Sequence, residues 1–137
     1  MKKVLNIAKI LFVISIASLM LTACGSPKVS EAHLNYGKKA LSIVDSYLSF
    51  DITAKEARKQ MLELYLRSDE LPDEAGTENF HNNLEVESAV GLLDSCLSNL
   101  SIDIDTEENL QELKKQRNRL AEAIGEDLIE VSEADSQ

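Results

Sequence analysis

The side chains best suited to nucleophilic or acid–base chemistry are one cysteine outside the N-terminal region and two histidines. A nucleophilic cysteine needs a neighbouring histidine or a helix N-terminus to form its thiolate. Cys96 follows His81 in one predicted helix at a separation of about 22 Å, at 1.5 Å per residue. The two side chains therefore cannot meet, and the apolar spacing around Cys96 predicts a buried, unreactive thiol. His33 and His81 fall near helix starts, where we expect both rings to be exposed.

The carboxylates do not match a known metal-binding pattern. Glu78 and His81 have the E-x-x-H spacing of helical metal ligands, but a dinuclear site needs two such motifs and further carboxylates. The alternating acids at 103–108 lack the glycine and the final glutamate of a calcium loop, and acids before a helix are expected from its dipole. There is also no glycine-rich phosphate loop, Ser–His–Asp set or zinc spacing. The sequence therefore predicts no metal, no cofactor and no enzymatic activity.

Three charged residues lie within or beside apolar stripes, which makes them the candidate binding residues. Arg117 occupies a position where its predicted helix needs an apolar residue. Either its stem runs along the bundle edge, or its charge pairs with an acid on another helix, such as Asp45 or Asp94. Each of these aspartates follows an apolar pair. If they face one another, they form an acidic spot for a cationic partner group; otherwise they mark the polar borders of their helices.

A second cysteine, Cys24, ends an N-terminal segment that has the order of an export signal. Three lysines between positions 2 and 9 precede a mainly apolar run at 10–21, which is shorter than the roughly 20 residues of a membrane span. Small residues then lead to the cysteine. The sequence Leu21-Thr22-Ala23-Cys24 resembles the lipobox of bacterial lipoproteins, and the resemblance is confined to the first 24 residues.

The lipobox resemblance implies that Cys24 receives a diacylglyceryl group and that cleavage removes residues 1–23. Lipid would then attach the mature chain to the extracytoplasmic face of the cell membrane. The chain itself would not span the membrane. Residues 24–29 would form a short tether, residues 30–131 the folded domain and residues 132–137 a polar tail. Only Cys96 would remain as a free thiol, so no intramolecular disulfide is expected.

The acidic composition limits the partners of the mature chain. The 137 residues carry a formal charge of −10, and removing residues 1–23, with three lysines and no acid, brings it to −13. Nucleic acid needs a basic face, so we exclude it as a partner. An anionic membrane surface does not attract such a domain either, so attachment depends on the lipid. Cations, basic peptides and apolar surfaces remain as ligands.

Four stretches with helical periodicity predict an all-α fold, a small bundle of about four helices. Their ranges are roughly 30–49, 53–67, 77–100 and 105–124, and residues 128–131 are expected to add a further turn. Thr53 and Glu56 match a capping box, and Gly125 is a candidate C-cap. The apolar stripes predict a core that includes Leu41, Val44, Leu48, Met61, Val90, Leu93 and Leu97.

An internal similarity links two of these stretches. Residues 40–49 and 89–98 are identical at five of ten positions. Either the chain holds two related αα-hairpins, or the match arises by chance between two Leu- and Ser-rich stretches. With a lipid anchor and no catalytic set, we expect a binding or scaffold lipoprotein that meets an envelope protein partner. The alternative is a receptor or accessory lipoprotein for a small ligand or metal.

Overall fold

The computed structural model describes residues 28–131, so Cys24, the segment before it and the polar tail lie outside the described residues. Four α-helices follow one another: α2 (Glu31–Leu48), α3 (Ala54–Tyr65), α4 (Phe80–Leu100) and α5 (Thr106–Ile124). A short 3-10 helix, η1 (Ser68–Glu70), follows α3, and residues 28–131 contain no strand. The prediction of a small all-α bundle is confirmed. None of these helices has the length and apolarity needed to cross a membrane.

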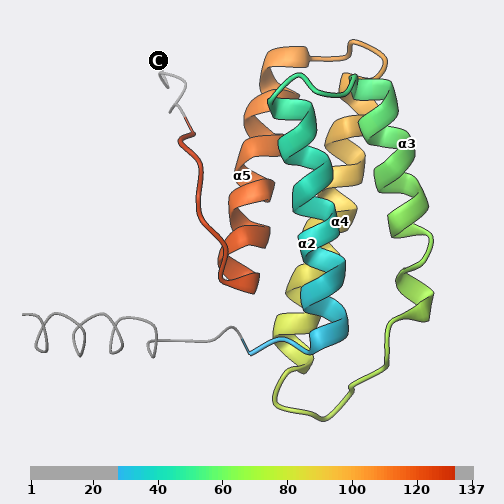
Figure 1. Cartoon of the computed structure of the whole chain (residues 1–137), viewed down its shortest axis with the longest axis vertical. Coiled ribbons are helices and arrows are strands. Elements are labelled where there is room, and N and C mark those ends of the chain that lie inside the picture. Colours follow the sequence, from blue (N-terminus) through green and yellow to red (C-terminus); the bar gives the residue numbers. More distant parts are fainter. Residues whose placement is uncertain (1–27, 132–137) are drawn as a thin grey trace, which may run out of the picture.

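The helices run alternately in opposite directions and form a four-helix bundle (Figure 1). α2 and α4 each contact the other three helices, whereas α3 and α5 lie at opposite corners. The most extensive packing is between α4 and α5. The bundle thus consists of two antiparallel hairpins, α2–α3 and α4–α5. The similar stretches 40–49 and 89–98 occupy the same place, the second half of the first helix in each hairpin.

Local sequence chemistry sets where the helices begin. The Thr53 hydroxyl accepts from the Glu56 amide, and the Glu56 carboxylate accepts from the Thr53 amide, so the predicted capping box is confirmed. α4 begins at Phe80, three residues later than predicted. The residues before it form a turn in which the Thr77 amide donates to the Glu74 carbonyl. This turn satisfies backbone groups that we had expected to belong to the helix.

The end of α5 differs from the prediction. Gly125 adopts a left-handed conformation, with φ of 74°, and is the C-cap as predicted. The chain then turns back, and no helix continues at 128–131, so the expected further turn is wrong. Instead, the Asn118 side chain accepts from the amide of Ile129 and donates to its carbonyl, at 2.8 and 2.7 Å. The terminal segment therefore runs beside α5 (Figure 1), with its backbone paired to a side chain.

The core fills the space between the four helices. Its apolar side chains are at most 6 % exposed, and every α-helix contributes to it. The predicted core residues are buried except Leu48, which is partly buried and packs against the core from its edge. The largest fully buried apolar side chains are Met61, Leu93, Leu97, Leu113, Leu120, Val44, Val86 and Val90. α4 contributes more of these buried apolar side chains than any other helix, and their removal from water stabilises the bundle.

Replacing Leu93 with alanine should lower the free energy of unfolding by about 2–5 kcal/mol, because the side chain is 0 % exposed and its removal leaves a cavity. The adjacent Leu92, which is 40 % exposed, provides the control, and Leu92→Ala should cost roughly 1 kcal/mol or less. Both values can be measured by urea unfolding of residues 25–137, followed by circular dichroism. Equal losses in the two variants would contradict the described packing of α4.

Candidate functional site

An ion pair between a buried arginine and a half-exposed aspartate joins α2 and α5. The Arg117 side chain is only 8 % exposed. Its Nε and Nη2 donate to the two carboxylate oxygens of Asp45 at 2.9 and 3.0 Å, and its Nη1 donates to the Asp127 carbonyl. A bidentate pair fixes the relative orientation of guanidinium and carboxylate. The structure therefore selects Asp45 as the interhelical partner predicted for Arg117, and the same guanidinium holds the terminal segment.

An open polar groove of about 550 Å³ lies over this pair, between α2 and the segment that follows α5. Two serines of α2 and the serine that caps its C-terminus line it, together with acids from both walls. These residues are Ser42, Ser46, Ser49, Asp51, Glu126 and Asp127. The two cations of the groove are already paired, Arg117 with Asp45 and Lys38 with Glu126 at 3.0 Å. The remaining charge is negative, so the groove suits a small cationic or hydroxyl-bearing group, while Arg117 acts as part of its floor.

Asp94, the third candidate residue, lies in a different environment. Burial raises the pKa of the Asp94 carboxyl, and Arg58 on α3 opposes this shift. Its Oδ1 is buried and has no hydrogen-bond partner among residues 28–131, and the same holds for the Tyr36 hydroxyl. Burial, followed by the nearby charges of Glu87, Tyr65 and Asp94, raises the pKa of Tyr36 to about 12. The two aspartates at equivalent hairpin positions therefore differ in environment. Asp45 forms an ion pair with Arg117, whereas Asp94 is partly buried near Arg58.

A second groove, of about 650 Å³, lies between α2 and α3. Its apolar lining comes from Ile43, Leu64 and Leu66. Its charged lining residues are Lys39, Glu63 and Arg67. None of these was a candidate binding residue from the sequence, because helical periodicity assigned them to ordinary apolar and polar stripes. The feature of the sequence that would have pointed to them is the sign of charge. Residues 31–67 carry six Lys or Arg against five Asp or Glu, whereas residues 68–131 carry four against seventeen.

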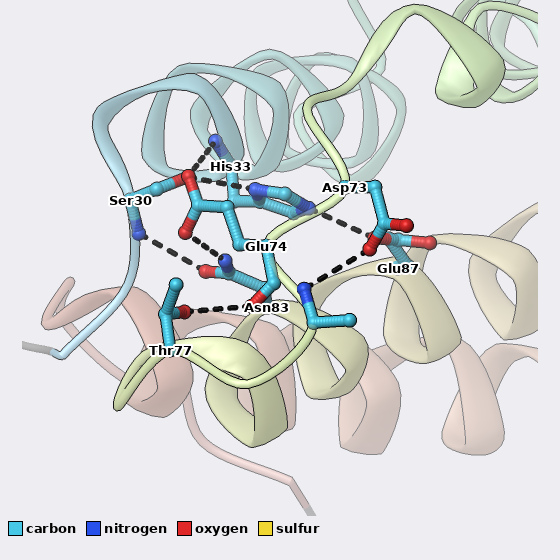
Figure 2. Close-up of polar contacts among 8 residues, drawn as sticks. Ser30, His33, Asp73, Glu74, Thr77, Asn83 and Glu87 are labelled. Atoms are coloured by element: carbon cyan, nitrogen blue, oxygen red, sulfur yellow. Dashed lines mark hydrogen bonds and ion pairs between the residues drawn. The ribbon is translucent and has the colours of Figure 1, made fainter.

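His33 corrects another expectation. Its ring is 1 % exposed, not solvated, because it lies between the start of α2 and the side of α4. Nε2 lies 2.8 Å from Glu87 Oε1, and Nδ1 lies 2.8 Å from the Ser30 hydroxyl (Figure 2). A carboxylate can only accept, so Nε2 donates to Glu87, and Nδ1 shares a hydrogen bond with the Ser30 hydroxyl. Both ring nitrogens are thus used in structural hydrogen bonds.

The same cluster ties the chain entering α2 to the start of α4. The Ser30 amide donates to Asn83 Oδ1 at 3.0 Å, and the Asn83 amide group donates to Glu74 at 2.8 Å (Figure 2). Beside them, Asn82 donates to the Lys28 carbonyl at 2.9 Å. Asn83 is only 2 % exposed, so this polar group is buried with its hydrogen bonds formed. We refer to the contacts of Lys28, Ser30, His33, Glu74, Asn82, Asn83 and Glu87 as the basal clamp.

The remaining candidates for chemistry have no reactive arrangement. Cys96 is buried as predicted, and burial, with a smaller effect from Glu112, raises its pKa to about 11. The thiol is therefore protonated at neutral pH and is a poor nucleophile. His81 is exposed, as expected. Within the described part of the chain, no three His, Cys, Asp or Glu residues are grouped so that they could hold a metal ion.

Comparison of this chain with protein-family models, with curated proteins and with solved structures gives no match. Its function is therefore inferred from its own residues and their geometry.

Arg117→Met should destabilise the domain by about 2 kcal/mol, because hydrogen bonds to charged groups typically contribute about 1.5–3 kcal/mol. Amide hydrogen exchange at Ile129 should also become faster, since the guanidinium no longer holds the terminal segment. Arg119→Met is the matched control, because Arg119 pairs with Glu85 at an exposed position and should contribute less than about 1 kcal/mol. If Arg117→Met melted at or above the wild-type temperature, the structural role of this charge would be refuted.

Asp94→Asn and Asp45→Asn should have opposite effects at pH 7. The unfolded Asp94 carboxyl has a pKa near 3.8 and burial raises the folded value, so the folded state loses stability as pH rises through this interval. Asp94→Asn should therefore stabilise the domain at pH 7, and this gain should disappear near pH 3, where the wild-type carboxyl is protonated in both states. Asp45→Asn should destabilise it at pH 7 by weakening the pair with Arg117. Urea unfolding across pH 3–7 measures both, and a loss of stability in Asp94→Asn at pH 7 would contradict the first.

Proposed function

We propose that this protein is a lipid-anchored binding module on the extracytoplasmic face of a bacterial membrane, where its helical surface meets an envelope protein. The lipobox resemblance at Cys24 supports the anchor. The observation that carries the proposal is the basal clamp, which fixes Lys28 and Ser30 to the start of α4. From Cys24 to Lys28 the chain spans at most about 14 Å, at 3.6 Å per residue. A lipid on Cys24 would therefore keep the clamped end of the bundle close to the bilayer.

The fold and charge favour binding to a protein over other roles. The acidic surface opposes contact with nucleic acid and gains nothing from anionic lipid headgroups. Two of the residues most suited to catalysis have structural roles. Cys96 is buried in the core, and His33 forms hydrogen bonds within the basal clamp. What remains on the surface of the described residues is a set of exposed large apolar side chains, including Leu66 at 68 % and Tyr65 at 41 %. Tyrosine in particular is enriched among the side chains that contribute most binding energy in protein interfaces.

A receptor for a small ligand is the second candidate, and the 550 Å³ groove over Arg117 and Asp45 favours it. A volume of this size falls within the range of small-molecule sites. Thermal melting of residues 25–137 against small cationic and hydroxylated compounds distinguishes the two functions. A ligand present at about 100 times its dissociation constant should add about 2.7 kcal/mol of stability. A saturable shift that Asp45→Asn abolishes would favour the receptor function.

In the native host, Cys24→Ser should release the protein from the membrane fraction. The mass of the variant should lack the contribution of the lipid. The physical reason is that two acyl chains hold a protein stably on a bilayer, whereas this acidic domain has no other strong attraction to it. Fractionation, immunoblotting and mass spectrometry measure the change, and Cys96→Ser serves as the control because Cys96 is buried. A Cys24→Ser protein that stays on membranes as tightly as wild type, with unchanged mass, would overturn the anchor.

Chemical cross-linking of intact cells tests the partner. The anchored wild-type protein should form a discrete adduct with one envelope protein, identified by mass spectrometry at near-stoichiometric recovery. The absence of such an adduct, together with a saturable small-ligand shift, would replace the proposed function with the receptor alternative.

A further inference from the structure

We propose that Phe50, at one end of the bundle, inserts into an apolar pocket with a basic rim on the partner protein; this inference rests on the proposed function and names its surface. Figure 1 shows the α2–α3 loop, 49–53, and the α4–α5 loop, 101–105, at the same end of the bundle, opposite the chain that enters α2. We refer to these two loops as the distal end. α4 spans 21 residues between the basal clamp and this end, which is about 31 Å at 1.5 Å per residue. A partner can therefore reach the distal end while lipid holds the other end of the bundle.

The backbone at Phe50 is strained. Its amide donates to the Tyr47 carbonyl at 3.0 Å, and the Asp51 amide donates to the Ser46 carbonyl at 2.9 Å. These two hydrogen bonds form a Schellman motif, which ends α2 and requires a left-handed residue. Phe50 is that residue, with φ of 62°. A bulky side chain rarely adopts this conformation, because its Cβ crowds the neighbouring backbone.

The end of α5 shows the usual form of the same motif. The Gly125 amide donates to the Glu122 carbonyl at 3.3 Å, and the Glu126 amide donates to the Ala121 carbonyl at 2.8 Å. Glycine has no Cβ and adopts the left-handed conformation without strain. Phe50 occupies the equivalent place and is 93 % exposed, so its ring gains neither a relaxed turn nor burial in the domain. Strain that packing does not require is typical of a functional residue.

The α4–α5 loop presents two further apolar side chains at the distal end. The Asp103 amide donates to the Leu100 carbonyl at 3.4 Å, and the Ile104 amide donates to the Asn99 carbonyl at 3.1 Å. Asp103 is the left-handed residue of this turn, with φ of 56°. On either side of it, Ile102 is 60 % exposed and Ile104 is 46 % exposed. An aromatic side chain with aliphatic neighbours is typical of the centre of a protein interface, where it fills a pocket of the partner.

The charge of the distal end determines the rim of that pocket. Residues 49–57 and 101–109 contain the two loops and the first turns of the helices that follow, and they carry six Asp or Glu against one Lys, a net charge of −5. All six acids are exposed, and none forms an ion pair with a basic side chain of residues 28–131. Lys or Arg around the pocket would complement this charge, whereas anionic lipid or the same end of a second copy would be repelled.

The acidic loop at the other end of the bundle lacks this combination. Residues 68–79 carry five Asp or Glu and no Lys or Arg, but no large apolar side chain among them is exposed. Acidity is therefore common to both ends, whereas exposed apolar side chains with acids around them distinguish the distal end. The two ends thus provide matched positions for variants.

Photo-cross-linking in the native host tests the surface. Benzoylphenylalanine at position 50 or at position 102 of the full chain should give an adduct with one and the same envelope protein. The segment of that protein joined to position 50 should hold Lys or Arg beside apolar residues. Leu66, after the far end of α3, and Leu92, midway along α4, are also exposed, and the same substitution there should give no adduct. Adducts from 66 or 92 but not from 50 would refute the distal end and leave the binding module standing, whereas adducts from no position would refute both.

Substitutions of Phe50 separate recognition from folding. Phe50→Ala and Phe50→Gly both remove the ring, so each should weaken binding of the cross-linked envelope protein, once purified, at least tenfold in titration calorimetry. Leu66→Ala is the control and should change binding less than about twofold. Phe50→Gly should also melt at a higher temperature than Phe50→Ala, because only glycine relieves the left-handed strain. Retained affinity in Phe50→Gly would overturn the proposal, and a lower melting temperature than that of Phe50→Ala would refute the strain on which it depends.

Paired charge variants test the basic rim. Asp103→Asn with Glu107→Gln removes two exposed acids from the distal end, and Asp69→Asn with Glu78→Gln removes two from the other end. The first pair should weaken binding of the same purified protein about fivefold or more at low salt and less at high salt, whereas the second should change it less than about twofold. Equal effects would follow from the net charge of the whole domain and would overturn the assignment of the rim.

Other occupants of the distal end give distinct results. Binding of residues 25–137 to phosphatidylglycerol vesicles, lost in Phe50→Ala, would overturn the proposal in favour of a membrane surface. A dimer in sedimentation, lost in the same variant, would overturn it in favour of a second copy of the chain. A monomer that ignores the vesicles and binds the cross-linked protein through Phe50 is the expected result.

Discussion

Burial of α4 is the constraint on which the rest of the structure depends. Residues 24–137 carry a formal charge of −13, and repulsion between like charges opposes any compact form. Cys96 is the one cysteine among the described residues, so no disulfide within 28–131 offsets this repulsion. Stability must therefore come from apolar packing, and α4 supplies much of it because it contacts all three other helices. Polar contacts then hold two further segments against this packed centre. The basal clamp holds the chain before α2, and Arg117 and Asn118 hold the segment after α5.

Much of the fold could be predicted because the relevant information is local. Helical periodicity located four helices, and the pairing of Thr53 with Glu56 located one helix start. For Arg117 the sequence left open a stem along the bundle edge or a pairing with Asp45 or Asp94, because nothing local says which residues of another helix lie beside it. Burial of His33 could not be predicted, since its partner Glu87 lies 54 residues away. Nothing local marked Phe50 as left-handed either, because glycine or asparagine usually occupies such positions.

The two hairpins share an apolar pattern and differ in charge. Equivalent residues such as Val44 and Leu93 are both fully buried, which is what the internal similarity would require. Yet the first hairpin is close to neutral, and the chain from 68 to 131 is strongly acidic. Asp45 and Asp94 illustrate the divergence, since Asp45 pairs with Arg117, whereas Asp94 has a buried oxygen with no hydrogen-bond partner among residues 28–131. Similar packing with dissimilar charge gives the bundle two chemically distinct sides, and so a preferred direction of approach for a charged partner.

The basal clamp also determines how mechanical load would enter the domain. If lipid holds Cys24 and a force pulls the domain away from it, the load is resisted at Lys28 and Ser30, the first described residues that bond to another helix. Asn82 and Asn83 would pass that tension directly into α4, so α2 would not be peeled from its end one turn at a time. Several hydrogen bonds would have to break together before the helices separate. Under such a load, the need to break these bonds together would slow forced unfolding of the bundle.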